Sequence, residues 1–155
     1  MKIQATISGY ANKPCTVYAY FDKESGVLVV SKEVDFRADR FSDCVIISNT
    51  ELPERESFFT PDRFNEGINS FFQMVSEDKI DIQDAASRCN PKNQIESDGI
   101  NEMGKRVFRL ANDITNGQIA VIAIAWYVSQ ALTIEKVLNF QDKLLELSAG
   151  SIYSI

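Results

Sequence analysis

The feature that most constrains this 155-residue chain is an apolar run from Gln118 to Leu132. Its ten central residues, 119 to 128, are all apolar, and no charged residue occurs between Asp113 and Glu135. The run is shorter than the roughly 20 apolar residues that a membrane-spanning helix needs. It is also too apolar for a helix that shows one face to solvent. We therefore expect a segment buried on all sides, around which the rest of the chain packs.

Four alanines in this run favour a helix over a strand, because alanine is a good helix former and a poor strand former. Apolar residues downstream recur near helical spacing, so we expect helices over 118–131 and 134–148. One unbroken helix over both would measure about 46 Å at about 1.5 Å per residue. A compact chain of this size is only about 40 Å across. We therefore predict a break near Leu132, with Thr133 capping the second helix.

The N-terminal third of the chain has the patterns of strands. Ile3, Ala5 and Ile7 alternate with polar residues, and residues 15–21 are rich in β-branched and aromatic side chains. The polar stretch 22–26 ends in Gly and is typical of a hairpin loop. Residues 2–50 therefore predict an antiparallel sheet of about four strands, built from hairpins.

Helical signals dominate the remainder of the chain. Thr60, Pro61 and Asp62 are typical of a helix start, and apolar residues recur at helical spacing from Phe64 to Val75. The expected helices are 61–76, 80–89, 100–115, 118–131 and 134–148, with a flexible polar loop at 90–99. Four or five helices thus follow the sheet. This order predicts a single α+β domain over residues 1–155.

The chain contains no histidine, which removes the usual general base at neutral pH and the commonest zinc ligand. Carboxylate-, lysine- or tyrosine-based chemistry stays open, but the composition favours a non-enzymatic protein without catalytic residues, cofactor or metal. Cys15, Cys44 and Cys89 are widely spaced and fit reduced thiols better than a disulfide framework. The first eight residues lack the apolar region of a signal peptide, so we expect a cytoplasmic protein.

Residues 51–84 contain nine acidic and three basic residues, so this window accounts for the whole net charge of −6. Such a chain suits neither nucleic acid nor a membrane as a direct partner, but it can attract a basic protein. Our leading hypothesis is a protein that occludes a toxin, nuclease or nucleic-acid-binding protein, as immunity proteins and inhibitors do. The expected partner-binding residues are Glu51, Glu54, Glu56, Phe58, Phe59, Asp62, Glu66, Asp78 and Asp81. The alternative is that the window is only a solvated face.

A second hypothesis is a small-molecule or anion-binding protein. Lys105, Arg106 and Arg109 form the dense basic cluster of the chain, and Trp126 is expected to line a pocket near them. The alternatives are that these bases pair with nearby acids, and that Trp126 packs in the core or at the interface of a homodimer. Asp78, Asp81 and Asp84 would share one side of a helix, but they lack the spacing of a calcium loop.

Overall fold

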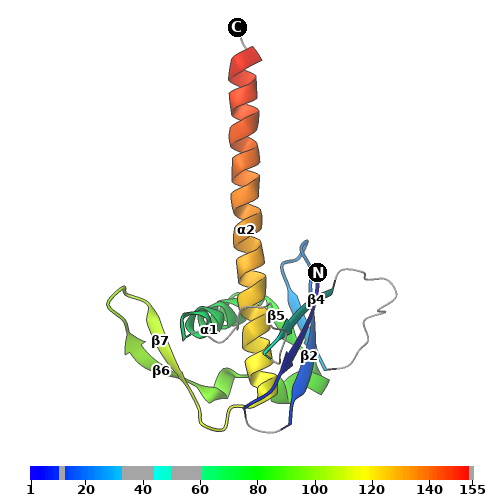
Figure 1. The fold of residues 1–155 in the computed structure, drawn as a ribbon, viewed down its shortest axis with the longest axis vertical. Coiled ribbons are helices and arrows are strands. Elements are labelled where there is room, and N and C mark those ends of the chain that lie inside the picture. Colours follow the sequence, from blue (N-terminus) through cyan, green and yellow to red (C-terminus); the bar gives the residue numbers. More distant parts are fainter. Residues whose placement is uncertain (11–12, 33–43, 50–60, 154–155) are drawn as a thin grey trace.

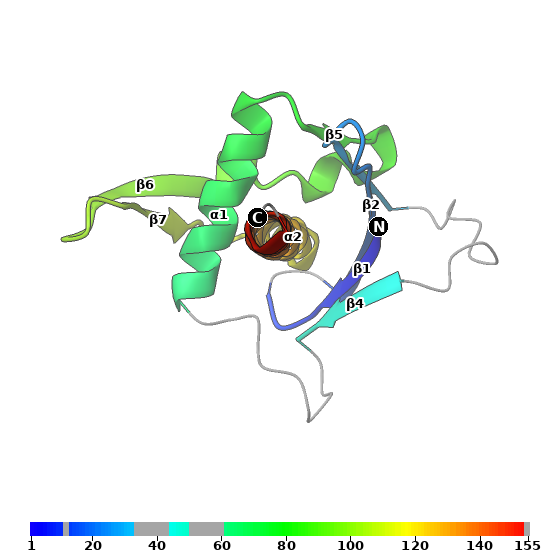
Figure 2. The ribbon, with the colours of Figure 1, turned by 90° about the horizontal axis from the view of Figure 1, so that it is seen from above.

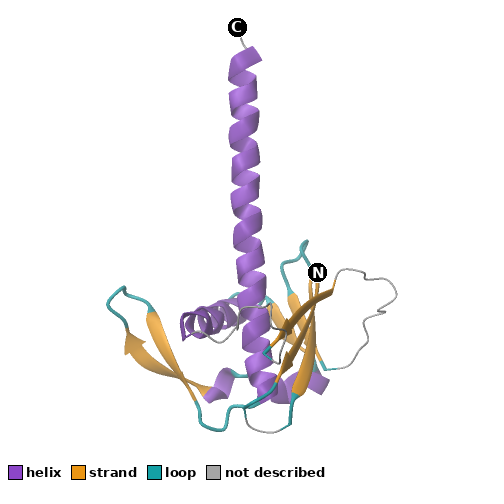
Figure 3. Cartoon of the chain, viewed as in Figure 1, coloured by secondary structure: helices purple, strands orange, loops and turns teal. Residues whose placement is uncertain are grey.

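The computed structural model describes residues 1–10, 13–32, 44–49 and 61–153, and it confirms the α+β class. Figures 1 and 3 show the arrangement of the elements. Their order is β1 (Lys2–Ile7), β2 (Cys15–Phe21), β3 (Leu28–Ser31), β4 (Cys44–Ser48), α1 (Pro61–Ser76), β5 (Ile80–Ile82), the 3-10 helices η2 (Asp84–Cys89) and η3 (Lys92–Gln94), β6 (Ile95–Ile100), β7 (Arg106–Leu110) and α2 (Asn116–Tyr153).

The main sheet is mixed, so the prediction of a purely antiparallel sheet is wrong. Its five strands lie in the order β4-β1-β2-β3-β5. The pairs β1–β2 and β2–β3 are antiparallel, as hairpins require. The two edge strands, β4 and β5, instead run parallel to their neighbours β1 and β3. Each edge strand reaches the sheet after a long connection, and only such a connection can join parallel neighbours.

One face of this sheet forms a wall of the core. Ile3, Ala5 and Ile7 of β1 are buried, as are alternate residues of β2 and β3, while the residues between them are mostly half-buried. This period of two confirms the half-buried strand predicted over the first residues of the chain. Helix α2 covers that apolar face.

The apolar run lies at the centre of the molecule, as predicted. Figure 2, which looks along α2, shows this helix between the sheet and α1. The seven residues from Ile119 to Ala125 are fully buried, and Val128 is buried as well. Trp126 and Tyr127 are half-buried, so the enclosure of the helix loosens after about three turns.

The predicted break near Leu132 is wrong, because α2 is one helix of 38 residues. At about 1.5 Å per residue it measures about 57 Å, and its C-terminal part projects away from the sheet and α1 (Figure 1). Thr133 does not cap a new helix. Its hydroxyl donates to the carbonyl of Ser129, 2.9 Å away, within the continuous helix. The expectation failed because it assumed that every helix fits inside the globular body.

By length and composition, the first 19 residues of α2, Asn116–Ile134, are sufficient to cross a membrane. More than half of this window is buried inside the protein. Burial between the sheet and α1 accounts for its apolar composition, since the core helix of a globular domain has the same character.

Helix α2 begins with a capping box formed by Thr115 and Gln118. The Thr115 hydroxyl accepts from the Gln118 amide at 3.3 Å, and the Gln118 side-chain oxygen accepts from the Thr115 amide at 2.9 Å. Asn116 is buried and joins this start to the loop after β1. Its side-chain oxygen accepts from the Tyr10 amide, and its NH₂ group donates to the carbonyl of Lys13.

The predicted helix at 100–115 is wrong, because these residues form most of the β6–β7 hairpin. Asn101 organises the turn by accepting from the amides of Met103 and Lys105, and Gly104 adopts a φ of 78°. Ile100 and Met103, which would lie on the apolar face of such a helix, are 71% and 81% exposed. The predicted loop at 90–99 is likewise replaced by η3 and β6.

Helix α1 has the predicted bounds, 61–76, whereas the predicted helix at 80–89 is replaced by β5 and η2. The apolar side of α1 packs as expected. Phe71 is fully buried, and Phe72 stacks between Phe71 and Phe108 of β7 with ring centroids 5.5 Å apart in each pair. Strand β5 pairs with β3 through its backbone, and this pairing overrides the local helical signal.

Helices α1 and α2 cross closely at Gly67, so we predict that Gly67→Ala destabilises the fold. A Cβ at this position would lie 2.9 Å from Cγ2 and 3.0 Å from the carbonyl oxygen of Ile122. The helices would have to separate, which costs about 1–3 kcal/mol despite the better helix propensity of alanine. Urea unfolding measures the loss. Gln73→Ala on the exposed side of α1 should stay within about 0.5 kcal/mol of wild type, and an equally stable Gly67→Ala would contradict the close crossing.

Candidate functional site

Four exposed carboxylates follow one another where the chain passes from α1 to η2. Glu77 and Asp78 form the turn that follows α1, Asp81 lies in β5, and Asp84 begins η2. We call these four residues the acidic edge, because β5 is the last strand on this side of the sheet. Asp78 adopts a φ of 55°, and the next amide, that of Lys79, donates back to the carbonyl of Met74. This turn redirects the chain from α1 into β5, and the four carboxylates on this corner are all exposed.

The charge of the acidic edge is not compensated within the described part of the chain. Glu77 accepts a hydrogen bond from the Gln73 side chain, and Asp81 accepts one from the Gln83 side chain, but both donors are neutral. Lys79, the one base in this run, donates to the carbonyl of Ser25 at 2.9 Å. Among the described residues, none of the four carboxylates lies in a salt bridge. The corner therefore presents excess negative charge to solvent.

The acidic edge differs from the helical face that the spacing of Asp78, Asp81 and Asp84 suggested. The chain is extended at Ile80–Ile82, so the three carboxylates do not share one side of a helix. In the described ranges, no three acidic or cysteine side chains converge in a way that could hold a metal ion.

The other expected partner-binding residues divide into two groups. Glu51, Glu54, Glu56, Phe58 and Phe59 lie outside the described residues. Asp62 is exposed in the first turn of α1, about 20 Å along that helix from the acidic edge.

Glu66 makes hydrogen bonds within the protein that the sequence did not predict. Its carboxylate accepts from the Trp126 indole at 3.1 Å and from the Gln130 side chain at 3.5 Å. The Arg63 guanidinium lies 5.1 Å from the centroid of the same indole ring. These contacts join α1 to α2, so Glu66 contributes to helix packing.

The structure separates the three bases that were expected to act together. Lys105 lies in the hairpin turn, and Arg106 and Arg109 are three residues apart in β7, which places them on opposite faces of the strand. Arg109 pairs with Glu96 on β6, and this hydrogen-bonded ion pair raises the pKa of the guanidinium. Lys105 and Arg106 are thus the two bases left to form a site.

Lys105 and Arg106 line a polar hollow of about 420 Å³ between α1, α2 and the hairpin. Asn65 positions the hairpin here, because its NH₂ group donates to the carbonyl of Arg106 and its side-chain oxygen accepts from the Phe108 amide. Trp126 does not line the hollow. The remaining lining is uncharged except for one carboxylate: Asn65, Glu66, Asn69, Ser70, Ser129 and Gln130.

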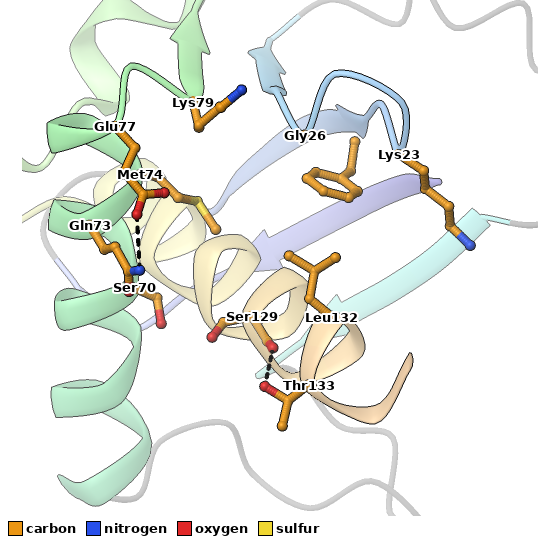
Figure 4. A pocket seen from close by; sticks show the side chains of 11 residues that line it. Lys23, Gly26, Ser70, Gln73, Met74, Glu77, Lys79, Ser129, Leu132 and Thr133 are labelled. Atoms are coloured by element: carbon orange, nitrogen blue, oxygen red, sulfur yellow. Dashed lines mark hydrogen bonds between the residues drawn. The ribbon is translucent and has the colours of Figure 1, made fainter. Parts of the chain in front are cut away.

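A second hollow, of about 410 Å³, adjoins the first and shares Ser70 and Ser129 with it. It lies between α1, the β2–β3 turn and α2, as Figure 4 shows. Met74 and Leu132 supply apolar surface, and charged side chains of both signs stand around it: Lys23, Glu77 and Lys79. Glu77 thus belongs both to this hollow and to the acidic edge.

The third hollow, of about 480 Å³, lies at the start of α2, far from the other two. Lys13, Lys32 and Arg88 line it together with two free thiols, Cys15 and Cys89. Among the described residues, no more than one carboxylate lines each of these three hollows.

Comparisons of the chain with protein-family models, with curated proteins and with solved structures gave no match.

Proposed function

We propose that the protein is a non-enzymatic cytoplasmic binding protein whose acidic edge engages and occludes a basic protein partner. The observation that carries this proposal is the run of four exposed carboxylates, Glu77, Asp78, Asp81 and Asp84, which contains a single base, Lys79, and makes no salt bridge among the described residues. A surface of one sign raises the local concentration of an oppositely charged partner and speeds encounter. The class of partner is a protein with a basic active or binding surface, such as a toxin, a nuclease or a nucleic-acid-binding protein.

The acidic edge suits a protein partner better than a small cation. Its carboxylates lie on a corner between the end of a helix, an edge strand and a 3-10 helix. Among the described residues, they do not converge on one point where a cation could bind. An exposed corner of this kind can contact a basic groove on a larger molecule. Strand β5 also ends the sheet, so its outer backbone groups can add to the contact.

We predict that reversing Asp81 and Asp84 to Lys slows association with the basic partner by at least about 10-fold. The effect should fall on association, with a smaller change in dissociation, and wild-type association should slow steeply as salt rises. The partner is first recovered by affinity capture with wild-type bait from the native host. Surface-based kinetics with the purified partner then measures both rates.

The matched control for this prediction reverses Asp98 and Glu102 to Lys. Both residues are exposed on the hairpin, and the change in net charge is the same. This control variant should associate nearly as fast as wild type. If both double variants slow association equally, or if salt has no effect on wild type, the acidic edge is only a solvated face.

The polar hollow beside the hairpin favours a second candidate function, the binding of a small anion. Lys105 and Arg106 line it, while its one carboxylate, Glu66, is already hydrogen-bonded to Trp126 and Gln130. The amide side chains around it supply further donors. The hollow therefore carries a net positive charge and offers hydrogen bonds to an anionic or zwitterionic molecule.

For this second candidate we predict that small anions stabilise the wild-type protein against thermal unfolding. The probes are inorganic phosphate and citrate, and a concentration of 100 times the dissociation constant should add about 2.7 kcal/mol. Lys105→Gln combined with Arg106→Gln should lose this gain, whereas Arg109→Gln should keep it because Arg109 pairs with Glu96. A gain that Arg109→Gln abolishes equally, or no gain with any anion, would refute this candidate.

We further propose that a second copy of the chain covers the projecting part of α2. Ile134 is 61% exposed where α2 leaves the body, and the sequence beyond it places Val137, Leu138, Leu144 and Leu145 near helical spacing. Helices in water owe most of their stability to the packing of such apolar residues. Pairing of two projecting helices provides that packing without involving the acidic edge.

Sedimentation equilibrium tests the homodimer. Leu138→Lys combined with Leu145→Lys should convert a dimeric wild type to monomers, because charge is then placed at the helix pair. Asn139→Lys combined with Glu146→Gln makes the same change in net charge at two positions, seven residues apart, that lie outside the helical spacing of these apolar residues, and this variant should remain dimeric. A wild type that is monomeric at all accessible concentrations would contradict the proposal.

A further inference from the structure

Cys15 and Cys89, 74 residues apart in sequence, bring their sulfur atoms together above Gly117. A Cβ placed on Gly117 would lie 2.5 Å from the Cys89 sulfur and 3.3 Å from the Cys15 sulfur. The absence of a side chain at Gly117 thus leaves the space in which the two thiols meet. Both thiols are free in the structure, and because both sulfurs lie within 3.3 Å of this one position, they are close neighbours.

Three separate elements hold this pair in place. Cys15 begins β2, opposite Ile7 of β1, and Cys89 ends η2. The first turn of α2 lies next to both cysteines and is hydrogen-bonded to the chain near each of them. The Asn116 side chain bonds to the carbonyl of Lys13, and the Gln118 NH₂ group donates to the carbonyl of Asn90 at 3.3 Å. The proximity of the thiols is therefore a property of the folded chain and not of a local turn.

The two thiols differ in environment. Cys15 is half-buried and lines the hollow at the start of α2, so a small molecule in the hollow can reach it. Cys89 is 3% exposed. Burial, together with the adjacent Cys15 thiol, raises the pKa of Cys89 to about 11. Cys89 lines the same hollow but is almost fully buried, so Cys15 is placed to react first and Cys89 to react with it.

The hollow itself selects for negative charge. Lys13, Lys32 and Arg88 line it, and none of the acidic residues in the described part of the chain does. We propose that Cys15 and Cys89 form a reversible disulfide by reaction with an anionic small-molecule disulfide that enters this hollow. Oxidised glutathione is such a molecule, since it combines a disulfide with several carboxylates.

The reaction balances in two exchange steps. The Cys15 thiolate attacks one sulfur of the small disulfide, forming a mixed disulfide and releasing one small thiolate. The Cys89 sulfur then attacks the Cys15 sulfur of the mixed disulfide and displaces the second small thiol, which takes the proton that Cys89 loses. Two protein thiols are oxidised and one small disulfide is reduced to two thiols. Because Cys89 is protonated at neutral pH, this closing step accelerates as the pH rises toward 11.

Treatment of the reduced, full-length native protein with oxidised glutathione tests the proposal. Alkylation followed by peptide mass mapping should find Cys15 linked to Cys89 and Cys44 free, and excess reduced glutathione should reverse the link. Cys89→Ser should accumulate the mixed disulfide on Cys15. Cys15→Ser should form neither product, and Cys44→Ser should behave as wild type. A link through Cys44, no trapped mixed disulfide in Cys89→Ser, or a link that forms only in urea would overturn the assignment.

A second comparison tests the role of the cations. Lys32→Gln combined with Arg88→Gln should slow oxidation by oxidised glutathione about 10-fold or more, but should leave oxidation by the uncharged hydroxyethyl disulfide within about 2-fold of wild type. Lys92→Gln combined with Arg109→Gln removes the same charge away from the hollow and should change neither rate. Equal slowing with both oxidants would overturn the selection for negative charge.

Discussion

The whole fold depends on the complete burial of the first three turns of α2. Residues 119–125 contact the sheet on one side and α1 on the other, so this segment forms the layer between them. Its alternation of alanine with valine and isoleucine lets both neighbours approach closely, and Gly67 does the same on α1. The position of α1 on α2 then determines where the acidic edge lies, because that edge begins at the turn that follows α1.

The β6–β7 hairpin also depends on the crossing of α1 and α2, because it is attached to α1. Asn65 of α1 bonds to the backbone of Arg106 and Phe108, as a neighbouring strand would, and Phe72 packs on Phe108. The hollow lined by Lys105 and Arg106 therefore exists only after α1 has docked on α2. The two surfaces that we propose for binding, the acidic edge and this hollow, have a common structural origin in the placement of α1.

The sequence predicted the elements whose signals are local. Helix α1 begins with Pro and has a single apolar stripe, and its bounds were predicted correctly. Strand β1 alternates strictly between apolar and polar residues, and its buried face was predicted correctly. The start of α2 was missed although Thr115 and Gln118 have the spacing of a capping box. The hairpin could not be recognised from its apolar residues, because Ile100 and Met103 are exposed and Gly99 and Gly104 provide the turn geometry. Strand β5 has no local signal at all, since its pairing with β3 is a tertiary contact.

The candidate sites depended even more than the helices and strands on contacts between distant parts of the chain. Lys105, Arg106 and Arg109 lie close together in the sequence, but strand β7 places Arg106 and Arg109 on opposite faces, and Arg109 pairs with Glu96. The proximity of Cys15 and Cys89 at Gly117 joins segments that no sequence pattern relates.

The continuity of α2 explains how these surfaces can coexist. The thiol hollow lies at the first residues of the helix, and the projecting part lies at the other end, separated by most of a rod about 57 Å long. A second copy bound along the projecting part would therefore leave the thiol hollow open to small molecules. A disulfide between Cys15 and Cys89 would join β2 to η2 across the start of α2, and η2 begins at Asp84 of the acidic edge. Cys89 and Asp84 are thus the two ends of the same short helix, so the disulfide would constrain the chain next to the acidic edge. The projecting part of α2 has no such connection to that edge.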